Sequence, residues 1–217
     1  MFFFAGQLIY SIYHHAFEKV SKDAMRGLCF FFGLMFISEV LLVLSIGVDY
    51  QYVRAPYIGP TLHLGMVDLP LRLLIPALAS GVLFAGIELF IRRTFTGRAI
   101  AAVAQDPVAL RLVAVDPVRI KRNAFGLSVA IAAIAGAMLV IIQPVEPSMG
   151  REYIGRVFAI CVLGGLGSLP GTLIAALLIG VIESLTATFW GASWAPAVSF
   201  SLLLLTLAFR PNGLLGR

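Results

Sequence analysis

The chain has 217 residues, of which 60% are hydrophobic and 12% are charged, and its mean hydropathy is +0.97. A soluble domain is about half apolar and about a quarter charged, so this composition excludes a globule with a water-covered surface. The formal net charge of +5 would raise nucleic acid as a partner of a soluble protein, but in a membrane protein the distribution of charge carries the information. We therefore expect an integral membrane protein that binds the lipid bilayer and no nucleic acid.

Three apolar stretches in the first two thirds of the chain are each long enough to span hydrocarbon, which takes about 20 residues. They are residues 28–47, 70–91 and 123–142. Residues 1–13 are apolar but short for a span, and we interpret them as a remnant of one or as an interfacial segment. Residues 48–69, rich in Pro, Gly and Tyr, are expected to form a loop.

Residues 92–122 form a long basic loop that contains two Asp-Pro pairs, Asp106-Pro107 and Asp116-Pro117. Asp is a strong N-cap, and Pro is favoured at the first helical position. The pattern predicts a helix over 98–104, a short helix from Pro107 to about Ala114, and a new helix from Pro117 that runs into the membrane. A short capped helix between two spans suits a docking surface for a soluble partner. The plain alternative is a solvated loop whose arginines set the topology.

The C-terminal part has a broken apolar region, residues 158–190, and a last expected span, residues 195–209. The break is a glycine-rich run, residues 164–171. A broken or re-entrant element there would reconcile the number of crossings with the charges of the loops. Because non-helical backbone at membrane depth is tolerated only where protein or a water-filled cavity covers it, this element is interpreted as lining a pathway. The alternative is a hinge between two packed half-helices.

The 16 Lys and Arg residues are distributed unevenly among the loops. Residues 14–27, the basic loop and the C-terminal tail hold 12 of them, and the remaining loops hold Arg54, Arg72, Arg151 and Arg156. Basic loops stay in the cytoplasm by the positive-inside rule. The basic loop and the C-terminus are therefore predicted to be cytoplasmic, and residues 143–157 are predicted to form a loop on the outer side.

No pattern of catalytic, metal-ligating or nucleotide-binding residues is recognisable in the sequence. Gly150 and Gly155 have the spacing of a phosphate-binding loop, but Arg156-Val157 replaces the required Lys and Ser/Thr. Cys29 and Cys161 lie in apolar runs and are expected to be packed thiols. The chain is predicted to be no enzyme and to hold no cofactor or metal, so any energy input must come from a partner or an ion gradient.

Two acidic residues fall inside apolar runs, where ionisable groups are costly and often functional. Glu39 lies near the middle of the first span, and Glu183 follows the glycine-rich run. Each is either a hydrogen-bonded carboxyl that holds helices together or part of a substrate or proton path. Small residues at every fourth position predict close helix packing or a subunit contact: Ala77, Gly81 and Ala85 in one span, Ala132 and Gly136 in another.

From Arg93 to its C-terminus, over about 125 residues, the sequence resembles the permease subunits of branched-chain amino acid ABC importers, the LivH-type branch in particular. The motifs that carry the resemblance are Gly97-Arg98-Ala99-Ile100, Ala102-Val103-Ala104-Gln105-Asp106, Pro147 with Met149-Gly150, Phe158, Val162-Leu163 followed by the glycine-rich run, Gly180 with Glu183, and Phe209-Arg210-Pro211-Asn212-Gly213-Leu214-Leu215-Gly216. The family usually has Gly-Ile where this chain has Ala114-Val115. Its members usually begin with further membrane helices, so residues 1–13 look like the remainder of that region, in a truncated gene model or a divergent short member.

The resemblance implies a fold and two sets of site residues. The fold is an all-α, polytopic membrane helix bundle with a glycine-rich broken or re-entrant element, in a single permease domain over residues 1–217. The basic loop is implied to contain the coupling helix that docks on an ATPase subunit, with Leu110 on the docking face, or Leu112 or Val113 if the helix is rotated. The residues assigned to coupling are Arg98, Asp106, Pro107, Leu110, Arg111, Asp116 and Pro117. Those assigned to the translocation path are Gly164, Gly165, Gly167, Ser168, Pro170, Gly171 and Glu183.

The implied function is that of the permease subunit of an ABC importer in the bacterial cytoplasmic (inner) membrane. It would carry branched-chain amino acids, or a related small polar solute, inward with ATP hydrolysed by a partner. The implied partners are ABC ATPase subunits, a second permease subunit, identical or homologous, and a periplasmic or extracellular substrate-binding protein. Two alternatives are an ion-coupled secondary transporter that uses Glu39 or Glu183, and a truncated fragment that packs against other membrane proteins without transporting.

Overall fold

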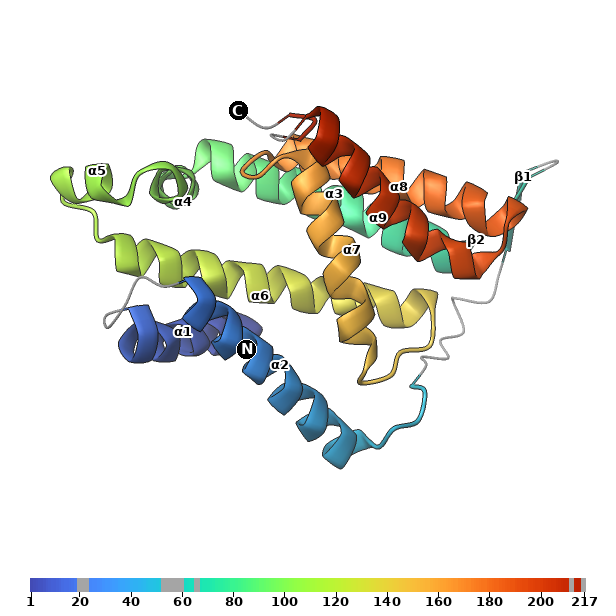
Figure 1. Ribbon diagram of the computed structural model, residues 1–217, viewed down its shortest axis with the longest axis horizontal. Coiled ribbons are helices and arrows are strands. Elements are labelled where there is room, and N and C mark those ends of the chain that lie inside the picture. The colour runs from blue at the N-terminus through green and yellow to red at the C-terminus, as the bar shows by residue number, and fades with distance from the viewer. Residues whose placement is uncertain (19–23, 52–60, 65–66, 211–212, 216–217) are drawn as a thin grey trace. The chain divides into compact units, whose positions relative to one another are not determined.

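The computed structural model describes residues 1–18, 24–51, 61–64, 67–210 and 213–215 (Figure 1). They belong to two compact units, Met1–Pro147 and Ser148–Arg217, and each unit is described by itself.

The first unit contains α1 (Phe2–Tyr13), η1 (His14–Glu18), α2 (Ala24–Ile46), β1 (Thr61–Leu64), β2 (Val67–Pro70), α3 (Leu71–Arg93), α4 (Phe95–Gln105), α5 (Pro107–Leu112) and α6 (Pro117–Ile142). The second unit contains α7 (Met149–Gly164), α8 (Leu169–Phe189), η3 (Ala192–Trp194) and α9 (Ala195–Phe209). The prediction of an all-helical protein holds for the described residues apart from β1 and β2, which pair as an antiparallel hairpin with Leu62 opposite Leu69. The expectation of a loop over 48–69 is therefore wrong for residues 61–64 and 67–69, which form strands. Its alternation of apolar and polar residues at Leu62, His63 and Leu64 has the period of a strand.

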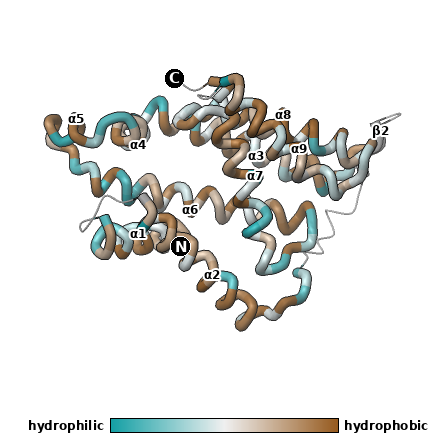
Figure 2. Tube along the Cα trace, in the orientation of Figure 1, coloured by the Kyte–Doolittle hydropathy of each residue, from teal (hydrophilic) through white to brown (hydrophobic). Residues whose placement is uncertain are grey.

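Within the described residues, five helical segments are long and apolar enough to cross a membrane: Met25–Ile46, Leu71–Arg93, Pro117–Ile142, Leu169–Phe189 and Ala192–Phe209. The first three and the last overlap the stretches expected as spans. The first of them, in α2, is brown along much of its length in Figure 2. It joins its unit through aromatic rings, with the centroid of Phe31 5.4 Å from that of Phe125, and exposes apolar side chains such as Leu44 elsewhere.

Helix α1 packs along α6 through a contact between two glycines. A Cβ added to Gly6 would lie 2.9 Å from Cα of Gly126, and a Cβ added to Gly126 would lie 2.8 Å from the carbonyl oxygen of Phe3. One turn away, Nε2 of Gln7 donates a hydrogen bond of 2.8 Å to Oδ1 of Asn123. Gly6 and Gly126 therefore let the backbones of α1 and α6 approach closely. In the small-residue stripe of α3, a Cβ added to Gly81 would have no neighbour within 4 Å among the residues described.

Glu18 ties η1 to α6. Its Oε1 lies 2.6 Å from Nζ of Lys121, and its Oε2 accepts a hydrogen bond of 2.8 Å from the hydroxyl of Tyr10 and lies 2.8 Å from Nδ1 of His14. Partial burial raises the pKa of Glu18, but the hydrogen bonds from Lys121, His14 and Tyr10 outweigh it and lower the pKa from 4.5 to about 2. The folded state is therefore stabilised by this carboxylate above pH 4.5, and the contribution is lost as the pH falls towards 2.

Helix α5 ends two residues earlier than predicted, at Leu112, in a Schellman motif. The N–H of Val115 donates to the carbonyl of Leu110 at 3.2 Å, and the N–H of Ala114 donates to the carbonyl of Arg111 at 3.1 Å. This motif requires left-handed backbone at Ala114, whose φ is +58°. Among the described residues it is the one non-glycine position with positive φ. A glycine at this position would adopt the left-handed conformation without the steric cost of a Cβ atom.

In the second unit α7, α8 and α9 pack pairwise around Ala159, Ile179 and Leu203 (Figure 1). Helix α7 begins at Met149, so residues 149–157, expected as part of an outer loop, are helical. The expectation was wrong because Arg151 and Glu152 resemble loop residues in a sequence, whereas in α7 they lie exposed on the helix surface.

The glycine contact between α1 and α6 predicts opposite behaviour for two substitutions in α6. Gly126→Ala places a methyl group against backbone and should destabilise the protein by about 1–3 kcal/mol. Gly136→Ala meets open space and should leave stability unchanged or raise it, because alanine is the better helix former. The midpoint of thermal unfolding in detergent measures both. Equal behaviour of the two variants would contradict the α1–α6 contact.

The left-handed backbone at Ala114 predicts that Ala114→Gly is stabilising. Relief of the steric cost of this conformation should amount to about 1 kcal/mol. The matched control is Ala101→Gly, at an exposed interior position of α4, which should destabilise by about 1 kcal/mol. The same unfolding measurement distinguishes them, and a loss of stability in Ala114→Gly would show that the Schellman motif is not formed.

Candidate functional site

Both Asp-Pro pairs of the basic loop begin helices. Oδ1 of Asp106 accepts a hydrogen bond of 2.8 Å from the N–H of Val108, and Oδ1 of Asp116 accepts one of 2.9 Å from the N–H of Val118. Pro107 and Pro117 are the first residues of α5 and α6. The local chemistry that predicted these helix starts is therefore the chemistry that the structure uses.

Leu110 faces the interior and does not lie on the outer face of α5. It is 7% exposed and packs in a core with Ala99, Val103 and Ile120, so it joins α5 to α4 and α6. Leu110 is thus buried where an exposed side chain was expected, whereas Leu112 and Val113, named as the alternative, are exposed. The exposed apolar side chains are Val108, Leu112 and Val113, which are 67%, 86% and 69% exposed.

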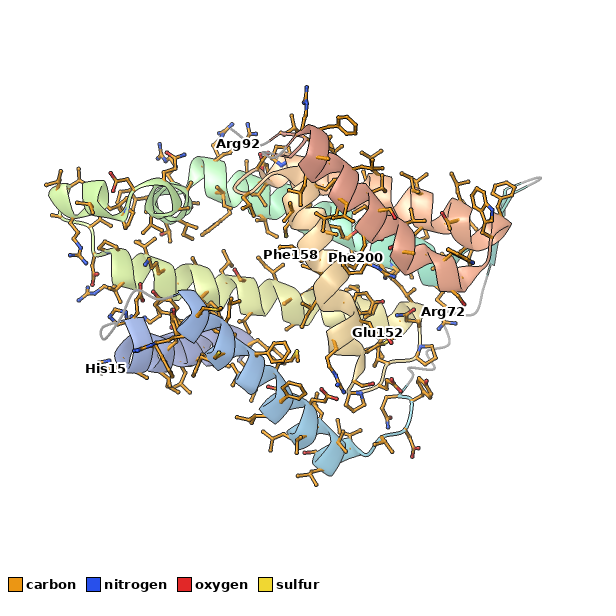
Figure 3. All side chains as sticks on the ribbon, in the orientation of Figure 1. His15, Arg72, Arg92, Glu152, Phe158 and Phe200 are labelled. Carbon is orange, nitrogen blue, oxygen red and sulfur yellow. The ribbon has the colours of Figure 1, made fainter. Side chains whose placement is uncertain are left out.

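Basic side chains are exposed on α5 and on the two helices that it joins. Arg98 on α4, Arg111 on α5, and Arg119 and Arg122 on α6 are all exposed. Arg92, at the end of α3 and labelled in Figure 3, is paired within its own helix, with Nε 2.5 Å from Oε1 of Glu88. We define Val108, Leu112 and Val113, together with Arg98 and Arg111, as the α5 surface. Exposed apolar and basic side chains together can bind a groove that offers apolar and acidic groups.

The glycine-rich run forms a short turn between two helices. Only Gly165–Ser168 are outside helices, whereas Leu169, Pro170 and Gly171 belong to the first turn of α8. Gly165 and Gly167 have φ values of +95° and +88°, and Oγ of Ser168 caps α8 by accepting from the N–H of Gly171 at 3.2 Å. No re-entrant element is found in the part of the chain that the structure describes, and the expectation that Gly171 is non-helical is wrong.

Close backbone contacts account for the glycines around this turn. A Cβ added to Gly164 would lie 2.6 Å from Cα of Thr172, and one added to Gly171 would overlap the carbonyl oxygen of Gly164. Gly213, after α9, approaches Gly165 in the same way, with 2.6 Å between the added Cβ and Cα of Gly165. The glycines therefore let α7, α8 and the chain after α9 meet at backbone distance.

The chain after α9 also caps α7. The N–H of Leu214 donates to the carbonyl of Leu163 at 2.8 Å, and the N–H of Leu215 donates to the carbonyl of Gly164 at 3.3 Å. These carbonyls are among the last of α7, which have no partner within the helix itself. The turn thus lies at the end of α9 where the tail begins. Its tip residue, Leu166, is 80% exposed.

At the other end of the second unit, Glu183 on α8 is in a polar cluster. Its Oε1 lies 3.2 Å from Nε of Arg156 on α7 and accepts a hydrogen bond from the hydroxyl of Ser199 on α9. The guanidinium of Arg156 also lies 5.2 Å from the ring centroid of Tyr153. Arg156 was expected in an outer loop, so sequence reasoning missed this pair. Had the helix expected from residue 158 onwards been extended back to Met149, Arg156 would have been placed on α7.

A glycine brings α7 and α9 together beside this cluster. A Cβ added to Gly155 would lie 2.6 Å from Cζ of Phe200, which is labelled in Figure 3. Glu39, the other acidic residue within a span, is half-exposed on α2 in the first unit.

The described residues contain no group of three His, Cys, Asp or Glu side chains placed to hold a metal ion. Both thiols are free, and Cys161 is half-buried as expected for a packed thiol. Cys29 is exposed on α2, which corrects the expectation for that residue.

The chain is similar to a group of transport proteins of known role. The family described as branched-chain amino acid transport system, permease component, matches residues 2–207. The high-affinity branched-chain amino acid transport system permease protein BraD of Pseudomonas aeruginosa is 37% identical over 154 residues, 70% of this chain and 50% of that protein. The corresponding LivH protein of Escherichia coli is 35% identical over 132 residues, 60% of this chain and 43% of that protein.

The similarity extends to LivM of Escherichia coli, a second permease protein of the same kind of system, which is 36% identical over 121 residues, 55% of this chain and 28% of that protein. No solved structure matches the chain. The chain spans about half the length of the curated relatives BraD and LivH that it matches. Because the family match covers nearly all of its residues, this multi-pass membrane chain belongs to the family of branched-chain amino acid transport system permease components.

Proposed function

We propose that the chain acts as the membrane-spanning permease subunit of an ABC importer that carries branched-chain amino acids inward. Its family membership and its similarity to BraD and LivH support this function. The observation that carries it is the α5 surface, which has exposed apolar and basic side chains on and beside a capped helix between two candidate spans. The permease binds no ATP itself, and the energy comes from ATP hydrolysed by a partner subunit.

In this proposal the α5 surface docks in a groove of the ATPase subunit. Leu112 and Val113 fill the apolar groove, and Arg98 and Arg111 pair with acidic groups at its edge. Asp106 and the Schellman motif fix the two ends of α5. Because Leu110 packs on Ile120 of α6, a displacement of α5 by the ATPase moves the start of a candidate span directly. Asp116 and Pro117 define that start.

The C-terminus and the glycine-rich turn are assigned to the cytoplasmic side. With 16 residues, α7 is about 24 Å long and crosses most of the hydrocarbon, so α7, α8 and α9 make three crossings from an outer loop to the tail. The hydrogen bonds from Leu214 and Leu215 to the end of α7 put the turn and the tail on one face. The basic residues of the tail and of the basic loop then share the cytoplasmic side.

This arrangement suggests roles for the remaining residues and partners. Gly164, Gly165, Gly167, Ser168, Pro170 and Gly171 shape the cytoplasmic end of the translocation path, where α7, α8 and the tail meet. Similarity to both LivH and LivM supports a second, homologous permease as partner. An outer substrate-binding protein supplies the solute to the permease in the bacterial inner membrane.

The ion pair of Glu183 with Arg156 argues against Glu183 as the proton carrier of a secondary transporter.

Leu112→Asp tests the docking surface. A charge at this 86% exposed position leaves the core of the unit intact but opposes an apolar groove. It should reduce copurification of the ATPase and ATP-driven leucine uptake into vesicles by about tenfold or more. The control Leu112→Met keeps an apolar side chain and should behave as wild type. Full uptake and copurification in Leu112→Asp would remove α5 as the coupling element.

Single cysteine substitutions test which side of the membrane each end of the second unit faces. They are introduced into a variant in which Cys29 and Cys161 are replaced by serine. Leu166→Cys at the glycine-rich turn should resist a membrane-impermeant thiol reagent in intact cells and react after the cells are opened. Trp194→Cys in η3, 62% exposed, should react in intact cells because it lies at the opposite ends of α8 and α9. The reverse labelling pattern would show that the second unit has the opposite orientation in the membrane.

A further inference from the structure

The pair formed by Arg156 and Glu183 leaves most of its bonding capacity unused. Both contacts of Glu183 use Oε1, and the contact of Arg156 uses Nε. Among the residues that the structure describes, Oε2 of Glu183 and the four N–H groups on the two Nη atoms of Arg156 make no hydrogen bond. A pair that served only to hold α7 to α8 would be expected to form the two-point contact that guanidinium and carboxylate groups favour.

These free groups are accessible to a ligand. Within the described part of the chain, no buried side-chain nitrogen or oxygen lacks a hydrogen-bond partner, so Oε2 and the Nη groups reach the surface of the unit. The Arg156 side chain is 36% exposed and that of Glu183 is 14% exposed. Lipid cannot satisfy free donors and acceptors. The face that carries them therefore meets water or another polar surface and not hydrocarbon.

The pair lies towards the end of the unit that is opposite to the glycine-rich turn. Glu183 is six residues before the end of α8, about 9 Å along the helix, and Ser199 is four residues after the start of α9. Arg156 is in the first half of α7. On the proposed topology this is the outer half of the membrane, which an incoming solute reaches first.

The charges match one class of solute. An α-amino acid presents a carboxylate and an ammonium group bonded to the same carbon atom, and the site presents a guanidinium fork and a carboxylate oxygen side by side. Guanidinium binds carboxylate in a two-point, charge-assisted manner, and a carboxylate oxygen accepts from ammonium. We propose that Arg156 binds the α-carboxylate and Glu183 binds the α-ammonium group of the transported amino acid, and that Ser199 orients Glu183. This assignment rests on the proposed function and adds the residues that recognise the zwitterion.

The test measures recognition of the ammonium group at the permease itself. The permease complex with its ATPase, in lipid nanodiscs and without the binding protein, is equilibrated with radiolabelled leucine. Leucine and 4-methylpentanoate, which is leucine without its ammonium group, then compete for binding. Wild type should prefer leucine by about tenfold or more, since a hydrogen bond between charged groups is lost in the analogue.

In Glu183→Gln the preference should collapse to near equality, because the charge that recognises ammonium is gone while size and hydrogen bonding are kept. Arg156→Gln should weaken the binding of both leucine and 4-methylpentanoate, since both carry the carboxylate. The control Thr186→Val changes a buried residue one turn along α8 whose hydroxyl bonds only to the carbonyl of Ile182, and its preference should remain that of wild type.

Two results would overturn the inference: no specific leucine binding to the wild-type complex, or an unchanged preference in Glu183→Gln. Either result leaves the proposed function standing if the wild-type complex with its binding protein still performs ATP-driven leucine uptake. Absence of that uptake would instead refute the proposed function.

Discussion

Hydrocarbon supplies no hydrogen bonds to the backbone, and this constraint governs where each helix of the chain ends. Every helix leaves unpaired N–H groups at its start and unpaired carbonyls at its end. Side-chain oxygens of Thr94, Asp106, Asp116 and Ser168 accept from the first N–H groups of α4, α5, α6 and α8. At the end of α7 the partners come from another part of the chain, the N–H groups of Leu214 and Leu215. These bonds fix the ends of the short connections between α4 and α5, between α5 and α6, and between α7 and α8.

Capping bonds and core contacts also make the region from α4 to α6 a single mechanical piece. The side chain of Asp106 caps the start of α5, and the Schellman motif fixes its end. Leu110 holds α5 against α4 and α6 through contacts with Ala99, Val103 and Ile120. A helix of only six residues has little stability of its own, so its orientation is set by these attachments. The side chains left outside, Val108, Leu112 and Val113, are thereby presented in a fixed arrangement.

Local sequence signals predicted what depends on local physics. The apolar runs located four of the five candidate spans, and the Asp-Pro pairs located the starts of α5 and α6. What failed depends on neighbours distant in sequence. The rotation of α5 is decided by Ile120 and Val103, which no pattern within α5 reveals. The contact of Gly6 with Gly126 and the pair of Arg156 with Glu183 join helices far apart along the chain. The charges near Arg156 also concealed a helix that buries apolar residues on its other side.

The attachment of the tail to α7 has a consequence for biosynthesis. A membrane protein is made from its N-terminus, and its earlier segments can pack before its later ones exist. The carbonyls of Leu163 and Gly164 receive their partners only from Leu214 and Leu215, about fifty residues later. The three-helix unit therefore cannot reach its final state while α9 is still emerging from the ribosome. Completion of α7 therefore depends on a segment made after α8 and α9, and the three-helix unit closes only once Leu214 and Leu215 have been added.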